Sequence, residues 1–243
     1  FRSNGVVLGN VQWSDEAEMF RAERAEIQWA FWHLFAGRVY LPQVRLAGAE
    51  LLLERDEDRR ANWRFSDEPR DDAAPRDLPD IDQLWLTDSR LRLVEKPFRT
   101  DLSVEVRSGR PAEGETFAPL LLGGAGTYRG NDFQLQGRID SPLLLAEREE
   151  PFRVDLEARA GATRARATGA LATPLQLEDF DLGFEISGDD MAELYTLLGL
   201  AIPTTSAYRL EGQLARQDGV WSYREVTGVV GDSDLSGEVV VDG

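Results

Sequence analysis

The chain has 243 residues, of which 42% are hydrophobic, and a formal net charge of −17 at pH 7. This length suits one large β domain or two small ones, and the hydrophobic content excludes wholesale disorder. The negative charge disfavours nucleic acids and anionic membrane surfaces as partners, because both are negatively charged themselves. The chain contains no cysteine, which excludes disulfides, thiol catalysis and thiolate metal sites.

The N-terminal region predicts a short strand and a short helix. Residues 6–13 are rich in apolar side chains, as in a strand, whereas residues 30–37 lack alternation and end at a glycine, as a short helix does. The most apolar stretch, residues 27–36, has about half of the ~20 residues that a membrane span needs. The sequence begins at Phe1 without methionine. We therefore expect a fragment from which an N-terminal membrane anchor is missing.

A strand-bend-strand pattern follows and recurs forty positions later. A partial copy returns near the C-terminus, where Asp232-Ser233-x-Leu235 matches Asp88-Ser89-x-Leu91. Each unit has one apolar face that it cannot bury alone, which predicts a sheet built by adding successive units side by side. We place the repeats at about 38–65, 78–107 and 208–243, within a single domain over 1–243. The two full copies are Val44, Leu46, Gly48, Ala49, Leu51 and Leu53, and Leu84, Leu86, Asp88, Ser89, Leu91 and Leu93.

Residues 66–79 separate the first two repeats and contain three prolines among dense charges, which predicts a mobile loop. Beyond residue 81, apolar and polar side chains alternate, as in strands with one dry and one wet face. Such strands are typical of antiparallel sheets. The expected fold class is therefore mainly β: a curved, twisted antiparallel sheet of strand-bend-strand repeats that forms an open groove, with one or two short helices.

The dry face of these strands is the candidate binding site. A groove for acyl chains needs only apolar side chains on every second residue, because each methylene removed from water contributes ~0.8 kcal/mol. In the alternative interpretation, the same side chains pack against a helix or another sheet. The residues expected to line the groove are Leu102, Val104, Val106, Phe133, Leu135, Val154, Leu156, Phe180, Leu182 and Phe184.

One further helix is predicted near the C-terminus. Asp190 and Glu193 form a capping box, in which the aspartate accepts hydrogen bonds from first-turn amides. Gly199 ends the helix, and Pro203 prevents its continuation. The residues at helical spacing are Met191, Leu194, Tyr195 and Leu198.

Three features could carry chemistry, and each has a structural explanation that we favour. The only histidine, His33, lies among apolar residues without a nucleophile motif. The glycines of residues 123–130 precede a strand rather than the helix that a phosphate loop requires, which favours a bulge or a strand crossing. Paired aspartates occur at 179 and 181 and at 232 and 234, where both members of a pair share one wet face instead of facing each other across a glycosidase cleft.

Motifs in both halves of the chain carry a resemblance to the AsmA family of Gram-negative envelope proteins. In the N-terminal half they are a turn at Leu34-Phe35-Ala36-Gly37, a strand pair within 46–55, and Ala61-Asn62-Trp63, which departs from the family pattern at Arg60-Ala61, where a glycine is usual. The C-terminal motifs are similar to the family signature in order and spacing. They are Gly188-Asp-Asp-Met, Leu194-Tyr195-x-Leu197-Leu198-Gly199, Ile202-Pro203-Thr204-Thr205-x-x-Tyr208 and Val230-Gly231-Asp-Ser233-Asp234-Leu235-x-Gly237.

The resemblance implies a fold, a location and a function. AsmA-like proteins are anchored in the inner membrane by one N-terminal helix and project into the periplasm. They resemble bridge-like lipid transfer proteins, in which a curved β-sheet forms a long apolar trough, and they are implicated in phospholipid delivery to the outer membrane and in outer-membrane assembly. The resemblance brings no catalytic residue, metal or cofactor to this chain.

Three classes of function remain open on the sequence. The first is a groove that binds or conducts phospholipid acyl chains between the two membranes. The second is a periplasmic scaffold that modulates outer-membrane protein assembly, with envelope assembly proteins as partners and no lipid cargo. The third, a hydrolase that uses paired carboxylates, needs two acids facing each other in a concave pocket. We expect a non-enzymatic protein.

Overall fold

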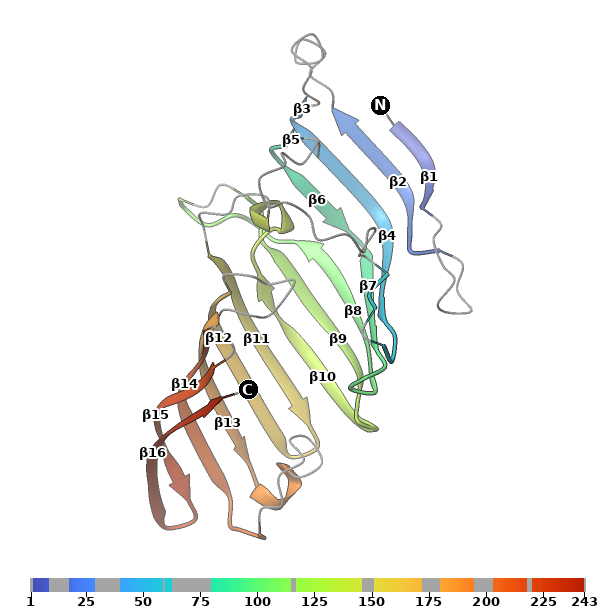
Figure 1. The fold of residues 1–243 in the computed structure, drawn as a ribbon. Helices are drawn as coiled ribbons and strands as arrows, with labels where there is room; N and C mark the ends of the chain where they lie inside the picture. Colours follow the sequence, from blue (N-terminus) through green and yellow to red (C-terminus); the bar gives the residue numbers. More distant parts are fainter. Residues whose placement is uncertain are drawn as a thin grey trace. The chain divides into compact units, whose positions relative to one another are not determined.

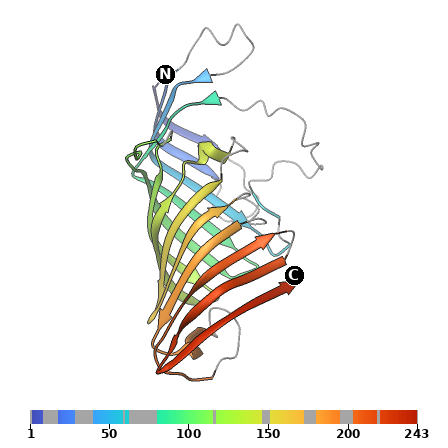
Figure 2. The ribbon, with the colours of Figure 1, turned by 90° about the vertical axis from the view of Figure 1, so that its left-hand side faces the viewer.

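The computed structural model describes residues 2–8, 18–28, 40–58, 60–62, 80–114, 117–145, 151–171, 180–194, 203–217 and 220–242. The chain divides into two compact units, Phe1–Leu120 and Leu121–Gly243 (Figure 1). In each unit the strands of the main sheet lie side by side in one curved, open layer (Figure 2). The expected fold class, mainly β with an open curved sheet, is confirmed. The single-domain assignment over 1–243 stays a prediction.

Unit 1 contains a mixed sheet in the order β1-β2-β4-β7-β8, with β6 beside β4, and a small parallel pair β3-β5. Strand β4 runs parallel to β6 and β7, whereas the pairs β1-β2, β2-β4 and β7-β8 are antiparallel. Its strands are β1 (Arg2–Leu8), β2 (Phe20–Gln28), β3 (Tyr40–Leu41), β4 (Gln43–Arg55), β5 (Asp80–Ile81), β6 (Leu84–Thr87), β7 (Ser89–Glu95) and β8 (Thr100–Ser108).

The forty-residue repeat of the sequence is reproduced in space. Val44 lies opposite Leu84 and Leu51 lies opposite Leu91, so equivalent residues of the two copies are direct neighbours. The expectation of a purely antiparallel sheet is wrong here, because two copies that lie side by side in the same orientation are necessarily parallel. Both copies bend at a residue with positive φ, +60° at Gly48 and +47° at Asp88. These bends let each copy keep its apolar residues on one face.

Unit 2 is a sheet in which the strands follow one another in chain order from β9 to β16. From β10 onward each strand pairs antiparallel with the next. Its elements are β9 (Leu120–Tyr128), β10 (Asn131–Ile139), the 3₁₀ turn η1 (Pro142–Leu145), β11 (Phe152–Ala160), β12 (Thr163–Leu171), β13 (Phe180–Gly188), the 3₁₀ turn η2 (Met191–Glu193), β14 (Tyr208–Gln217), β15 (Val220–Val230) and β16 (Ser233–Asp242).

The predicted cap at Asp190 is confirmed, since its Oδ1 accepts a hydrogen bond of 2.9 Å from the backbone N–H of Ala192. The same oxygen accepts a second bond of 2.9 Å from the N–H of Thr205. The described part of this element is the single turn η2. Tyr195, Leu198 and Gly199 lie outside the described residues. So do residues 9–13, the helix expected at 30–37 with His33, Trp63, the expected loop at 66–79, and Asp179.

Large and small side chains alternate from strand to strand across one face of unit 2. Gly137 lies opposite Leu156, which in turn lies opposite Ala167 on the next strand. A Cβ added at Gly137 would collide with the backbone carbonyl of Asp155 and come within 2.9 Å of the Leu156 Cα. Gly169 stands in the same relation to Leu182. The glycines therefore let neighbouring strands approach closely while a leucine covers the position.

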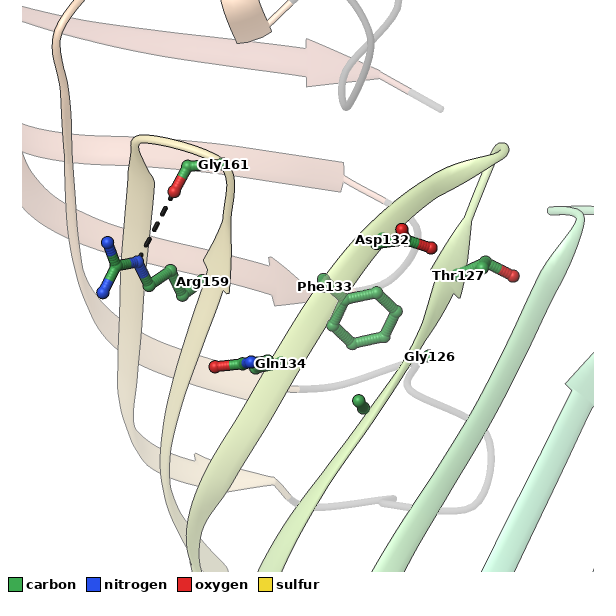
Figure 3. Close-up of a pocket in the computed structure, with 8 residues that line it drawn as sticks. Gly126, Thr127, Asp132, Phe133, Gln134, Arg159 and Gly161 are labelled. Carbon is green, nitrogen blue, oxygen red and sulfur yellow. Dashed lines mark hydrogen bonds between the residues drawn. The ribbon is translucent and has the colours of Figure 1, made fainter.

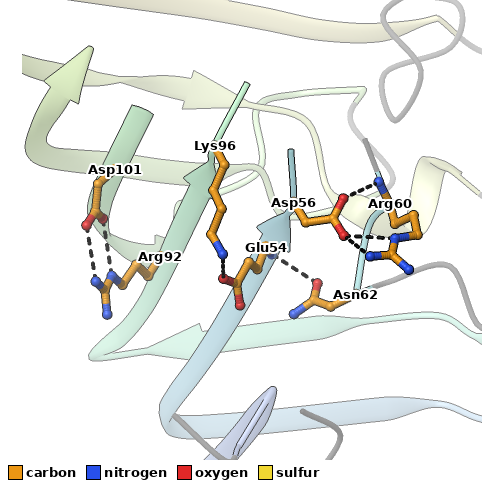
Figure 4. Close-up of polar contacts among 7 residues, drawn as sticks. All are labelled: Glu54, Asp56, Arg60, Asn62, Arg92, Lys96 and Asp101. Atoms are coloured by element: carbon orange, nitrogen blue, oxygen red, sulfur yellow. Dashed lines mark hydrogen bonds and ion pairs between the residues drawn. The ribbon is translucent and has the colours of Figure 1, made fainter. Parts of the chain in front are cut away.

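Asn62 closes part of an edge of β4 in unit 1 (Figure 4). Its side-chain Oδ1 accepts a 3.0 Å hydrogen bond from the N–H of Glu54, and its Nδ2 donates a 3.0 Å bond to the carbonyl of Leu52. The backbone N–H of Asn62 also donates to the Glu54 carbonyl over 2.9 Å. Asn62 and the Glu54 side chain are 1% and 2% exposed, and Lys96 Nζ lies 3.6 Å from the Glu54 carboxylate. The Asn62 side chain thus makes two hydrogen bonds to the backbone of β4 that a neighbouring strand would otherwise make.

We expect Asn62→Ala to lower the free energy of unfolding by about 2–4 kcal/mol, because it leaves a buried N–H and a buried C=O without partners. Urea denaturation checks this. Gln136→Ala is the matched control, since it removes an exposed amide bonded to the Glu157 carboxylate and should change stability by under about 1 kcal/mol. Equal losses in the two variants would contradict the role of Asn62.

We expect Gly137→Ala to destabilise unit 2 by about 1–3 kcal/mol, because the added methyl meets strand backbone that must move. Gly123→Ala is the control: it also lies inside a strand, but its added Cβ has nothing within 4 Å. That variant should be neutral or more stable by up to about 1 kcal/mol. The melting temperatures of both variants test this prediction. An unchanged melting temperature for Gly137→Ala would contradict the close approach of Gly137 to the neighbouring strand.

Candidate functional site

Seven of the expected groove residues come together on one face of unit 2. Leu135 pairs with Ala158 on β11, and the rows through Val154 and Leu156 continue across β12 to Leu182 and Phe184 on β13. Because alternate residues of a strand share a face, Phe133 and Phe180 lie on the same side. We call this surface the apolar face of unit 2. It comprises Phe133, Leu135, Ile139, Phe152, Val154, Leu156, Leu171, Phe180, Leu182, Phe184, Ile186, Leu210 and Leu214.

The apolar face of unit 2 remains partly open to solvent. Of the seven expected residues on it, Val154 alone is buried, at 8% exposed, and the other six are half-buried. The described strands of unit 2 all belong to one sheet, so no second sheet of described strands packs on this face. That these residues line a groove stays a prediction.

The other three expected residues, Leu102, Val104 and Val106, share one face of β8 in unit 1. They lie opposite Leu93, Leu91 and Ser89 of the second repeat copy. Val104 and Val106 are 2% and 6% exposed, which makes them more deeply buried than most of their counterparts in unit 2. The expected set is therefore divided between two units.

The opposite face of unit 2 carries ion pairs between neighbouring strands. Arg166 pairs with Asp155 at 3.0 Å and Arg209 with Glu185 at 3.1 Å. The hydrogen bond from Arg166 to Asp155 raises the pKa of that guanidinium. Both pairs are exposed, so water and salt screen them and each contributes little to stability. These charged side chains stay in contact with water, so the two faces of the sheet differ clearly, one charged and one apolar.

Unit 1 has the same kind of wet face. Arg21 donates a 2.9 Å hydrogen bond to Glu50 on the neighbouring strand, and this bond holds the pKa of the carboxyl below its usual value. Arg92 forms a two-point contact with Asp101, through bonds of 3.2 Å and 3.1 Å (Figure 4). Charged residues thus occupy the side opposite Leu51, Leu53, Leu91 and Leu93, and Leu52 is buried among them.

The glycine-rich segment is part of a strand. Gly123 and Gly126 lie inside β9, and β10 follows after a turn at Arg129 and Gly130, where φ is positive. A hollow beside the segment includes Asp132 and Arg159, and the Arg159 Nε donates to the Gly161 carbonyl (Figure 3). A helix N-terminus, which a phosphate loop needs, does not follow the glycines. The bulge or strand crossing expected here stays a prediction.

The described members of the paired aspartates are ion-paired or exposed. Asp181 pairs with Arg224 at 2.9 Å, and Asp232 and Asp234 are exposed where β15 turns into β16. Within the described ranges, no group of three or more histidines or acids is placed to hold a metal ion. No helix in this part of the chain is long and apolar enough to cross a membrane.

The expected set omitted several residues of the apolar face, and the one that differs most in chemistry from the rest is Arg216. Arg216 lies opposite both Phe180 and Trp221. Its guanidinium carbon is 5.3 Å from the centre of the Trp221 ring, and that ring meets Phe180 edge-on at 5.6 Å. The signal was present, because Arg216 continues the alternation of Leu210, Gly212 and Leu214.

Comparison with known proteins supports the motif-based resemblance. The AsmA family model matches residues 1–109. Over 97% of its length the chain is 27% identical to the AsmA family protein YhjG of Escherichia coli (strain K12), and it spans 38% of that protein. No solved structure matches the chain. Both matches confirm the resemblance to the AsmA family that the sequence motifs indicate.

Proposed function

We propose that the apolar face of unit 2 binds phospholipid acyl chains, as part of a periplasmic domain of an inner-membrane-anchored envelope protein. One observation carries this proposal: a broad apolar face, continuous across five paired strands, is left partly exposed by the described residues. The relationship to the AsmA family supports it, because AsmA-like proteins are implicated in phospholipid delivery between the two membranes.

The energetics favour an extended apolar ligand. Each methylene that moves from water onto such a face gains up to ~0.8 kcal/mol. The half-buried leucines and phenylalanines gain as well, since the ligand removes their remaining exposed surface from water. This binding needs neither a catalytic group nor a fixed hydrogen-bonding partner along the chain. We therefore propose a non-enzymatic role in phospholipid transport and outer-membrane biogenesis, which is the role that the resemblance to the AsmA family implies.

A second function is favoured by strand β16. It is the last strand in the order of unit 2, and it carries exposed apolar residues, Leu235 at 45% and Val240 at 66%. A scaffold that binds outer-membrane assembly proteins through these exposed apolar side chains, without lipid, is the alternative.

To test the lipid function, we expect phospholipid to be recovered with the purified domain at near-stoichiometric level in native mass spectrometry and lipid extraction. The double variant Leu182→Asp/Phe184→Asp should reduce the recovered phospholipid on the order of tenfold or more, because two charges would be covered by acyl chains. Circular dichroism should show that strand content is kept.

The matched control is Gln134→Asp/Gln213→Asp, which adds the same charge on the opposite face, where each new carboxylate lies across from an arginine. It should retain lipid as the unmodified chain does. If the purified domain contains no lipid and also does not bind added phospholipid, the lipid proposal is contradicted and the scaffold function is favoured.

A further inference from the structure

Two arginines lie directly opposite each other on the charged face of unit 2, which is the face opposite its apolar face. Arg159, near the end of β11, is in register with Arg164, near the start of β12. Both residues are exposed. Like charges at directly opposite positions destabilise a pair of strands. The fold therefore gains nothing from placing these two charges side by side.

Arg159 and Arg164 also differ from the other arginines of this face. Acidic residues outnumber basic ones by 44 to 27 in the chain, yet no ion pair joins either of the two to a described residue. The remaining arginines of this face from β11 to β15 each have a carboxylate partner. Their ion pairs are Arg153 with Asp140 at 3.0 Å, Arg166 with Asp155 at 3.0 Å, Arg209 with Glu185 at 3.1 Å and Arg224 with Asp181 at 2.9 Å.

The acids in the next row of the sheet are bound to other residues. Glu157 on β11 accepts a 3.1 Å hydrogen bond from Gln136, and Glu185 on β13 pairs with an arginine of β14. Directly across from Arg164 on β13 lies Ser187, which is uncharged and carries a hydroxyl donor. The two guanidinium groups thus form a local positive patch on an otherwise acidic chain.

A hydrogen bond and a hollow define the surroundings of Arg159. Its Nε donates a 3.4 Å hydrogen bond to the carbonyl of Gly161, in the turn that joins β11 to β12, and its guanidinium points away from Asp132 (Figure 3). The two Nη groups make no hydrogen bond to a described residue. The hollow beside Arg159 has a volume of about 630 Å³, and Thr127 and Asp132 line it. These two side chains offer hydrogen-bonding partners for the hydroxyl groups of a ligand.

We propose that Arg159 and Arg164 together bind a phosphate monoester, and that the hydroxyl-bearing group attached to the phosphate occupies the hollow beside Arg159. Two guanidinium charges match a phosphate monoester, which carries a charge of about −1.5 to −2 at pH 7, better than a singly charged diester. Each planar guanidinium can donate two parallel N–H bonds to phosphate oxygens. The site lies on the charged face, so it does not depend on the acyl-chain function proposed for the apolar face.

The test is titration calorimetry of the full chain with glycerol 3-phosphate, a soluble phosphate monoester. We expect it to bind about tenfold more tightly than the diester glycerophosphocholine, and we expect glycerol not to bind. Arg159→Gln and Arg164→Gln should each weaken the binding of glycerol 3-phosphate about tenfold. Arg209→Gln is the matched control, because it removes an arginine of the same face that already has a carboxylate partner, and it should bind as the unmodified chain does.

Two further measurements separate a binding role from a structural one. Without ligand, Arg159→Gln and Arg164→Gln should melt at the same temperature as the unmodified chain or higher, because each removes one of two like charges. A lower melting temperature in both variants would show that the arginines serve the fold and would overturn the site. Gln134→Asp places a carboxylate across from Arg159, so it should weaken glycerol 3-phosphate binding while the apolar face retains its lipid.

The phosphate monoester could belong to a free metabolite or to a lipid headgroup, and vesicles distinguish the two sources. If vesicles of dioleoylphosphatidylcholine capture the chain only when they contain dioleoylphosphatidic acid, and Arg159→Gln/Arg164→Gln abolishes the capture, the site takes a lipid headgroup. Binding of glycerol 3-phosphate without such capture assigns a soluble ligand. Leu182→Asp/Phe184→Asp should keep glycerol 3-phosphate binding, which separates this site from the acyl-chain function. No binding of either probe, or equal binding by the unmodified chain and both arginine variants, overturns the proposal.

Discussion

The structure depends on one geometric constraint, the two-residue period of side chains along a strand combined with strict register between strands. In unit 2, Leu156, Ala167 and Phe184 are direct neighbours across three strands, so their side chains share a face. A slip of one residue would send one strand's apolar set to the wet side. The cross-strand ion pair of Arg166 with Asp155 works against such a slip, because it would be lost together with the apolar contacts.

The same constraint explains the bends of unit 1. In each repeat the apolar residues before the bend and those after it are separated by an odd number of positions. In a regular strand they would therefore point to opposite faces. The backbone bends with positive φ at Gly48 and Asp88 lie between them at the same point of both copies, and we infer that they bring Leu46 and Leu51 to one side. Since equivalent residues pair directly, one copy's bend lies beside the other's, and the two deviations fit together rather than interrupting the sheet.

Much of this could be predicted from sequence, because alternation is a local signal. It located β8, β10, β11 and β13 and the faces of their leucines and phenylalanines, and the cap at Asp190 followed from residue type and spacing. The parallel pairing of β4 with β7 could not be predicted, because strand direction depends on how the chain returns between the copies. The role of Asn62 was hidden for a similar reason: its partners are backbone groups of β4, and backbone groups leave no mark in the sequence.

A single-layer sheet with one apolar face is a costly arrangement in water unless something covers that face. In a closed domain a second sheet or a helix would do so and would leave side chains such as Leu182 and Phe184 buried, yet both remain partly exposed. A cover that is part of the chain would stabilise the fold permanently, whereas a cover that can leave gives the face a function. The rows of small and large side chains suit a mobile apolar ligand, because they offer a continuous surface without a pocket that fixes one position.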